Sequence, residues 1–455
     1  MNSVLELISV LYGIMGCVYL CIAVRGILHK NEMSIFDIIR LMYSFAFGFA
    51  PCLVYYQEAQ GARNLDFYDY SYSGLARIGL MLFFSILAFA VINLAYKSVH
   101  QKESSVRMPR DLNEEERYDI SRRLFRSGVI ALVIGWICLI LWTRAYGSIE
   151  NFIVNASLIR SGRGKVYNSL AFFKQFVRIL PISLYAFVSA YCYEQPKRLK
   201  KIKYIIVFLI SIVGNYYYFM ASDSRVTIIY IGMAILMIYL RHRKKEKIGR
   251  YLFMTGVTIG ILLFLTMFAD TYTHYVRYGI WESNSTGIID SLTKEFKFLC
   301  ASDMKASKVW YEGNLHYKIG DDLVNAATSW IPERFIPFAI PDTVWTYNTN
   351  LFGSVSSGTL PSSLVSTSIY EFGMLGVVIF PFCFGIVAGY ADKRLWKKSS
   401  VVYADVYYGL LVGIFVQMVS HNQISTFVMS MFPGFLFFII SYLCDRVRLN
   451  HNEER

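Results

Sequence analysis

The chain alternates long apolar runs with short polar connections over most of its length. Runs of about 18–22 apolar residues recur, which is long enough for a helix to cross roughly 30 Å of hydrocarbon. Only 17% of the 455 residues are charged and the mean hydropathy is +0.41, whereas a soluble domain carries about 25% charged residues. This pattern predicts an all-α polytopic membrane protein with about eleven transmembrane helices (ten to twelve), at residues 4–25, 37–56, 75–96, 127–144, 172–193, 204–221, 226–240, 251–269, 369–390, 402–420 and 426–443.

Basic residues gather in the connections on one side of the predicted bundle. Loops 97–126, 195–203, 241–250 and 391–401 carry eight, five, six and four Lys or Arg respectively. Short loops rich in Lys and Arg face the cytoplasm, so we expect the N-terminus outside and the C-terminus in the cytoplasm. The net charge of +13 therefore does not indicate nucleic-acid binding, which would need the charges on one folded surface.

One connection is far longer than the others and is expected to face outward. It divides the predicted chain into a membrane bundle at 1–269, a large extracytoplasmic loop at 270–368, and a second bundle with a cytoplasmic tail at 369–455. The loop is rich in aromatic residues, Pro and Ser, and it has no acidic or Gly-Ser tract of the kind that marks disorder. We expect it to fold onto the bundle.

The end of this loop carries the most informative motif of the chain. The stretch "GTLPSSLVSTSIYEFGMLGVVIFPFCFGI" is rich in small residues, Ser and Thr, and it enters a span through Tyr370, Glu371, Phe372, Gly373 and Gly376. Together with many spans and one large outward loop, this segment resembles the oligosaccharide repeat-unit polymerases, the Wzy-type O-antigen and capsule polymerases. An Arg-x10-Gly signature described in some members is absent after Arg160, Arg163, Arg277 and Arg334.

The resemblance implies a GT-C-like fold and an enzyme, a glycosyltransferase of the bacterial inner membrane. Such a polymerase joins undecaprenyl-diphosphate-linked repeat units into O-antigen or capsular polysaccharide at the outer membrane face. Its partners are the lipid-linked oligosaccharide, membrane lipids and a chain-length regulator protein, with no nucleic acid. No cofactor is required because the donor is already activated, and no metal is expected.

Two alternatives remain open. The first is an O-antigen ligase, although Gly434 follows His421 and Asn422 two residues too late for the ligase-type His-Asn-x9-Gly pattern. The second is a flippase or exporter of lipid-linked oligosaccharide, which predicts charges inside the bundle and short loops throughout.

The chemistry of such a polymerase requires a group that stabilises the diphosphate. Arginine suits this role because its planar guanidinium pairs with two phosphate oxygens. The candidates for diphosphate binding are Arg160, Arg163, Arg225 and Arg334. Each has a structural alternative, which is anchoring at lipid headgroups for the first three and an ion pair with Glu333 for Arg334.

The acceptor hydroxyl needs a general base, and the sugars need polar and aromatic contacts. Glu371 lies where the loop re-enters the membrane, and His421 lies in a short outer turn; these are the catalytic candidates, with capping of a span and an ordinary turn histidine as the structural alternatives. The sugar-binding candidates are Trp330, Trp345, Tyr347 and Asn348. Packing within the loop is the alternative for the aromatic residues.

Overall fold

The computed structural model describes most of the chain and is helical almost throughout that part. The described residues are 2–30, 34–61, 71–99, 112–155, 169–194, 201–221, 225–242, 288–328, 335–353, 360–397 and 402–453, with a few isolated positions between 260 and 331. Strand pairing among them is limited to one bridge, between Ser362 and Asn422.

Eight helical segments of the described chain are long and apolar enough to cross a membrane. They coincide with eight of the predicted spans, and the predicted spans 226–240 and 402–420 form shorter apolar helices. The predicted span 251–269 lies outside the described residues, apart from isolated positions. The all-α polytopic membrane class is therefore confirmed, while the number of spans and the outward placement of the large loop stay predictions.

The chain divides into two compact units, and α16, α17 and α18 contribute residues to both. Unit 1 comprises residues 1–102, 285–393 and 414–429, and unit 2 comprises residues 103–284, 394–413 and 430–455.

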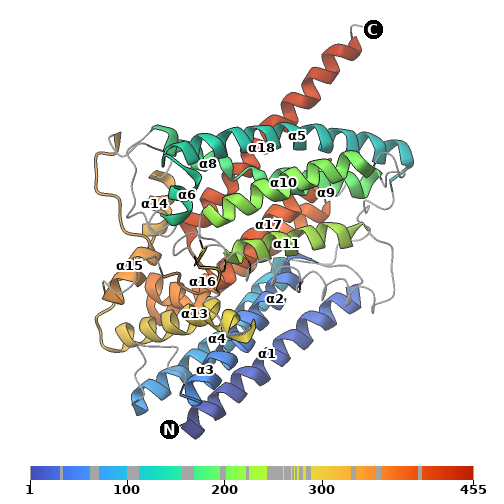
Figure 1. The fold of residues 1–455 in the computed structure, drawn as a ribbon. Coiled ribbons are helices and arrows are strands. Elements are labelled where there is room, and N and C mark those ends of the chain that lie inside the picture. The colour runs from blue at the N-terminus through green and yellow to red at the C-terminus, as the bar shows by residue number, and fades with distance from the viewer. Residues whose placement is uncertain are drawn as a thin grey trace. The chain divides into compact units, whose positions relative to one another are not determined.

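The helices of each unit are labelled in Figure 1. Unit 1 holds α1 (Asn2–Lys30), α2 (Ile35–Ser44), the π-helical turn η1 (Phe45–Phe49), α3 (Ala50–Ala59), α4 (Tyr72–Val99), α13 (Ile288–Tyr311), α14 (Asp321–Thr328), α15 (Val344–Leu351) and most of α16 (Leu364–Lys397). Unit 2 holds α5 (Glu114–Arg144), α6 (Ile149–Val154), the 3-10 turn η3 (Ser169–Phe173), α8 (Lys174–Val177), α9 (Leu180–Glu194), α10 (Lys201–Ala221) and α11 (Arg225–Arg241). The helices α17 (Ala404–Ser420) and α18 (Ile424–Glu453) are shared.

In unit 1, a close helix crossing brings α1 against the stretch α2–η1–α3. A Cβ atom on Gly48 would lie 2.3 Å from the Cα atom of Gly16, so only glycine allows the two backbones to approach this closely. The hydroxyl of Ser44 donates to the carbonyl oxygen of Gly16 over 2.7 Å. Small residues at such crossings are typical of helices that pack within membranes.

The N-terminus of α2 is capped by two separate carboxylates. Ser34 and Asp37 form a capping box, in which each side chain accepts a hydrogen bond from the other residue's backbone N–H. The carboxylate of Asp392 on α16 accepts the N–H groups of Ile35 at 2.9 Å and Phe36 at 3.2 Å. These bonds satisfy N–H groups that have no partner within the helix.

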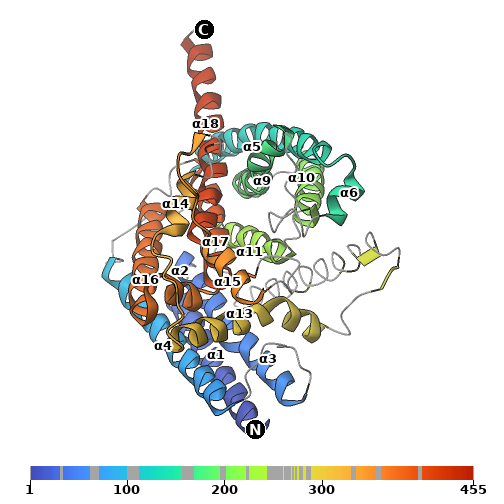
Figure 2. The same cartoon turned by 90° about the vertical axis from the view of Figure 1, so that its left-hand side faces the viewer.

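The helices α13, α14 and α15 arise from the segment that the sequence predicts as a large loop. α13 packs against α3 and α4 (Figures 1 and 2). Cys300 and Met304 of α13 share a buried apolar cluster with Leu5, Tyr55 and Ile78. The expectation that this segment folds against membrane helices is met for α13.

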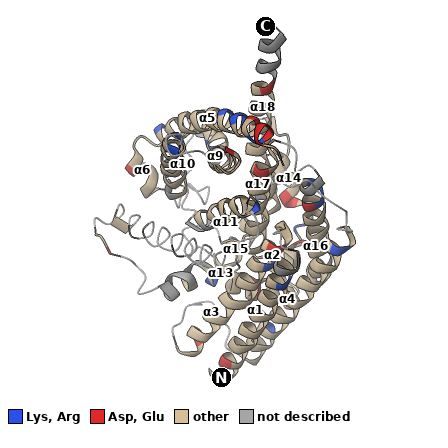
Figure 3. Cartoon of the chain, turned by 90° about the vertical axis from the view of Figure 1, so that its right-hand side faces the viewer, with Lys and Arg blue, Asp and Glu red and all other residues tan. Residues whose placement is uncertain are grey.

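Unit 2 is built around α5 and α9. The largest residues of its apolar cluster are Trp142, Phe152 and Phe187, and the rings of the first two meet edge to face at 4.4 Å. The charged residues of α5, coloured in Figure 3, lie mostly toward its N-terminal end; residues 114–116 are glutamates in the first turn, and Arg144 lies in the last turn. This placement complements the helix dipole.

Unit 2 also contains a buried ion-pair cluster. Asp405, in the first turn of α17, places one carboxylate oxygen 3.1 Å from Nη1 of Arg241 and the other 2.7 Å from Nε2 of His242. The Arg241 guanidinium lies 5.1 Å from the centre of the Tyr408 ring. A buried carboxylate in unit 2 is thus matched by cationic and aromatic neighbours.

Candidate functional site

The Ser/Thr-rich segment that the sequence singles out forms the buried start of α16. The hydroxyl of Ser363 accepts the backbone N–H groups of Val365 at 3.1 Å and Ser366 at 3.0 Å. In return, the backbone N–H of Ser363 donates to the hydroxyl of Ser366 at 2.8 Å. Ser362, Ser363 and Ser366 are fully buried. These residues therefore supply the helix cap inside the protein, where water cannot do so.

A break in α16 follows two turns later, within the Tyr370–Gly376 motif. Gly373 adopts φ +63° and ψ −147°, a conformation open to glycine but strained for other residues. A Cβ atom on Gly376 would lie 1.8 Å from the carbonyl oxygen of Ser368, and one on Gly373 would lie 3.1 Å from the Tyr317 ring. The two glycines of the motif thus permit a helix interruption and the close approach of two backbone segments.

Glu371 lies directly before this break and is 1% exposed. Its Oε2 atom accepts the backbone N–H of Gly320 at 3.0 Å. Its Oε1 atom is buried and has no hydrogen-bond partner among the described residues. The neighbouring segment is held in place by the N–H of Lys318, which donates to the carbonyl oxygen of Tyr370 at 3.0 Å. A buried carboxylate oxygen without a partner is costly, and such groups cluster at functional sites.

A second buried carboxylate, Asp303 on α13, meets the cap of α16. The hydroxyl of Ser363 donates to its Oδ1 atom, and the neighbouring Ser302 donates to the hydroxyl of Ser366 at 2.9 Å. Burial raises the pKa of Asp303 to about 7, with the hydrogen bonds from Ser363 and Ser366 opposing the shift. Asp303 can therefore exchange a proton near neutral pH.

A third buried carboxylate, Asp322 on α14, joins two other helix N-termini. Its Oδ1 atom accepts the N–H of Val344 at 2.9 Å, at the start of α15, and its Oδ2 atom accepts the N–H of Ile424 at 2.9 Å, at the start of α18. Burial raises the pKa of Asp322, while these backbone hydrogen bonds lower it. Both of its oxygens are occupied by backbone N–H groups, so Asp322 positions α15 and α18.

The turn that contains His421 is anchored to the same part of unit 1. The N–H of Asn422 donates to the carbonyl oxygen of Ser362 at 2.8 Å, and the Asn422 carbonyl oxygen accepts Nε1 of Trp345 at 2.8 Å. Nδ1 of His421 lies 2.9 Å from the hydroxyl of Ser420. The imidazole ring is 4.6 Å from the ring of Phe298. The orientation of the histidine is thus fixed by several neighbours.

The structure brings five of the predicted site residues into unit 1: Glu371, His421, Trp345, Tyr347 and Asn348. Asn348 is fully buried; its amide donates to the carbonyl oxygen of Leu360 at 2.9 Å and accepts from the Tyr370 hydroxyl at 2.7 Å. The Tyr347 hydroxyl accepts the N–H of His316 at 3.1 Å. Trp345 and Tyr347 are partly exposed. Of this group, Asn348 already uses its side-chain amide in hydrogen bonds within the protein.

The other predicted residues cannot be placed. Arg160, Arg163, Arg334 and Trp330 lie outside the described residues, and Arg225 begins α11 with a side chain that is also outside them. Their roles stay predictions.

Sequence reasoning did not single out two cations in unit 2. Lys174 lies with Nζ 5.8 Å from the centre of the Trp142 ring. Arg178 has its Nη1 atom buried without a hydrogen-bond partner among the described residues. The sequence itself could have indicated these two cations, because two basic residues four positions apart in an apolar segment are unusual. Asp303 was missed for a different reason, since its burial depends on Ser363, 60 residues away.

Among the residues that the structure describes, no three His, Cys, Asp or Glu side chains are grouped to hold a metal ion. Comparisons of the chain with protein-family models, with curated proteins and with solved structures found no match.

Proposed function

We propose that the protein is a membrane glycosyltransferase that polymerises oligosaccharide repeat units carried on undecaprenyl diphosphate, at the outer face of the bacterial inner membrane. In each step the bond between the anomeric carbon of the donor chain and its phosphate oxygen breaks. A hydroxyl of the next lipid-linked unit forms a new bond to that carbon. The hydroxyl proton passes to a base on the protein, and the undecaprenyl diphosphate leaves.

The observation that carries this proposal is the state of Glu371. A general base must offer a free carboxylate oxygen at a fixed position, and Oε1 of Glu371 is buried without a partner while Oε2 is held by Gly320. The break at Gly373 fixes the backbone directly beside it. We assign Glu371 as the base that receives the acceptor proton.

His421 and Asp303 have supporting roles in the proposal. His421 is the second candidate base, and its contact with Ser420 sets the orientation of the ring. Asp303 is held by Ser363, and its raised pKa of about 7 makes it a reservoir for a proton near neutral pH. We assign binding of the diphosphate to the arginines expected from the sequence: Arg160, Arg163, Arg225 and Arg334.

A deletion strain tests the proposal against its main alternative. Loss of a polymerase should leave cell-surface glycolipid that carries a single repeat unit, because export still works. Loss of a flippase or exporter would leave no repeat unit at the surface, and that result would reject the proposal. Complementation with the wild-type gene should restore the ladder of long chains on a gel.

A further inference from the structure

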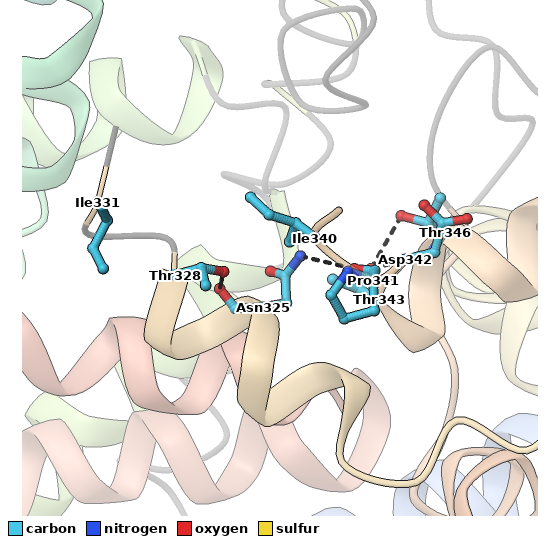
Figure 4. A pocket seen from close by; sticks show the side chains of 8 residues that line it. All are labelled: Asn325, Thr328, Ile331, Ile340, Pro341, Asp342, Thr343 and Thr346. Carbon is cyan, nitrogen blue, oxygen red and sulfur yellow. Dashed lines mark hydrogen bonds between the residues drawn. The ribbon is translucent and has the colours of Figure 1, made fainter. Parts of the chain in front are cut away.

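A polar pocket lies beside the start of α15, apart from the buried carboxylates described above. Its volume is about 350 Å³, within the size range of small-molecule sites. Figure 4 shows its lining, which comes from α14, from Ile331 after it, from the segment before α15 and from α15 itself. The lining residues are Asn325, Thr328, Ile331, Ile340, Pro341, Asp342, Thr343 and Thr346.

The walls of this pocket are held in place by hydrogen bonds. The amide of Asn325 donates to the carbonyl oxygen of Pro341 at 3.3 Å, which links α14 to the segment before α15 (Figure 4). Thr343 caps α15 by accepting the N–H of Thr346 at 3.2 Å, and the two hydroxyl oxygens lie 3.1 Å apart. One turn before Asn325, Asp322 binds the first N–H of α15. A pocket with fixed walls costs little ordering entropy when a ligand enters.

The chemistry of the lining favours a neutral, hydroxyl-rich ligand. It offers one carboxylate, from Asp342, one carboxamide and three threonine hydroxyls, all of which can bond to sugar hydroxyls. Ile331, Ile340 and Pro341 add apolar surface for the carbon face of a ring. Asp342 is exposed and would repel phosphate, and no Lys or Arg is among the described lining residues.

We propose that this pocket binds an uncharged sugar ring of the lipid-linked oligosaccharide, at a distance along the substrate from its diphosphate. The assignment rests on the proposed function and adds a saccharide subsite to it. The aromatic residues expected to bind sugar, Trp345 and Tyr347, share α15 with Thr346 but do not line the pocket. Sugar recognition at this pocket therefore depends on Asp342, Asn325 and Thr346.

The first test measures binding without any transfer reaction. Full-length protein in lipid nanodiscs is mixed with glucose, galactose, mannose, rhamnose and N-acetylglucosamine, and saturation transfer to each sugar is recorded by NMR. We expect transfer to at least one sugar, and a fall of at least fivefold in the double variant Asp342→Asn, Asn325→Ala. Transfer to none of the sugars, or equal transfer in both proteins, would overturn the proposal.

The matched control is Asp321→Asn, which removes a carboxylate from α14 outside the pocket lining and should leave transfer unchanged. Inorganic pyrophosphate should not compete with the bound sugar, because Asp342 repels it. Competition by pyrophosphate would reassign the pocket to the charged end of the substrate. Because this assay needs no turnover, sugar binding can stand even if the deletion strain rejects a polymerase.

The second test measures how the pocket affects the kinetics of chain extension. With lipid-linked repeat units as substrate, Asp342→Asn should raise KM at least tenfold and leave kcat within twofold, because the pocket binds ground state and transition state alike. A loss confined to kcat would contradict a binding role. Thermal unfolding confirms that the variant is folded, which the exposed position of Asp342 favours.

Discussion

The buried carboxylates of the described chain are held in two ways: some pair with a cation, as Asp37 of unit 1 does with Arg40, and others do not. In unit 2, Asp405 lies between Arg241 and His242, so its charge is compensated by the Arg241 guanidinium and its second oxygen pairs with the His242 ring. In unit 1, Asp303, Asp322 and Glu371 make no ion pair with the described residues and are held only by hydroxyl or backbone N–H groups. A compensated carboxylate holds helices together, whereas an uncompensated one exchanges protons more readily.

This difference separates structural acid groups from candidate functional ones without any knowledge of relatives. Asp322 lies between the two kinds, because both of its oxygens accept backbone N–H groups although it pairs with no cation among the described residues. Glu371 stands at the other extreme, with one oxygen that lacks a partner among the described residues. Glu371 is therefore the strongest catalytic candidate among these carboxylates, and Asp405 is the one expected to contribute most to stability.

The largest expected effect on stability comes from breaking the compensated cluster. Asp405→Ala leaves Arg241 buried without its carboxylate and should lower the free energy of unfolding by about 3–5 kcal/mol. SDS titration in mixed micelles, followed by tryptophan fluorescence, measures this change. The control Asp119→Ala removes a half-exposed pair with Arg123 and should cost under about 1 kcal/mol. Equal losses in the two variants would mean that Asp405 is not the structural anchor of unit 2.

A smaller loss of stability is expected at Asp322, whose carboxylate is held by backbone N–H groups instead of cations. Asp322→Asn puts an amide donor against the N–H groups of Val344 and Ile424, so one hydrogen bond is lost at a cost of about 1–3 kcal/mol. The neighbouring variant Asp321→Asn, which only loosens a surface contact with Lys318, should change stability by less than about 1 kcal/mol. The same titration compares them, and a harmless Asp322→Asn would remove its assigned positioning role.

The stability of the protein should depend on pH through Asp303. The pKa of Asp303 is about 7 in the folded protein, above its ordinary value of 3.8, so the native state keeps a proton that the unfolded chain has released. Stability should therefore fall as pH rises from about 4 to about 7, by on the order of 1 kcal/mol per pH unit from this residue. Thermal unfolding across this pH range should show a shallower slope for Asp303→Asn. Identical slopes would show that Asp303 ionises normally.

The sequence predicts the helices well because their signal is local. Long apolar runs identify helices at every predicted span that lies in the described chain, and the α2–η1–α3 stretch extends the predicted span 37–56 to Ile35–Ala59. What the pattern does not show is the π-helical turn at Phe45–Phe49, which occurs where Gly48 meets α1. A local deviation imposed by a distant helix leaves no periodic signature.

The candidate site is predictable only in part, for the same physical reason. The Glu371 motif and the Ser/Thr-rich segment are contiguous in sequence, so they stand out, and the structure turns them into a helix cap and a helix break. Asp303 on α13 pairs with Ser363, 60 residues away, and Asp322 on α14 pairs with the N–H of Ile424, 102 residues away. Their neighbours arise from tertiary packing, which no single segment encodes.

The most direct test of the account is the rate of chain extension by the variant Glu371→Gln. Purified protein in nanodiscs is supplied with undecaprenyl-diphosphate-linked repeat units, and the control is Glu312→Gln, which alters an exposed surface pair with Lys308. We expect a rate at least about 100-fold lower for Glu371→Gln, with the folded protein retained, and a normal rate for the control. A Glu371→Gln protein that extends chains within twofold of the wild-type rate would contradict the account.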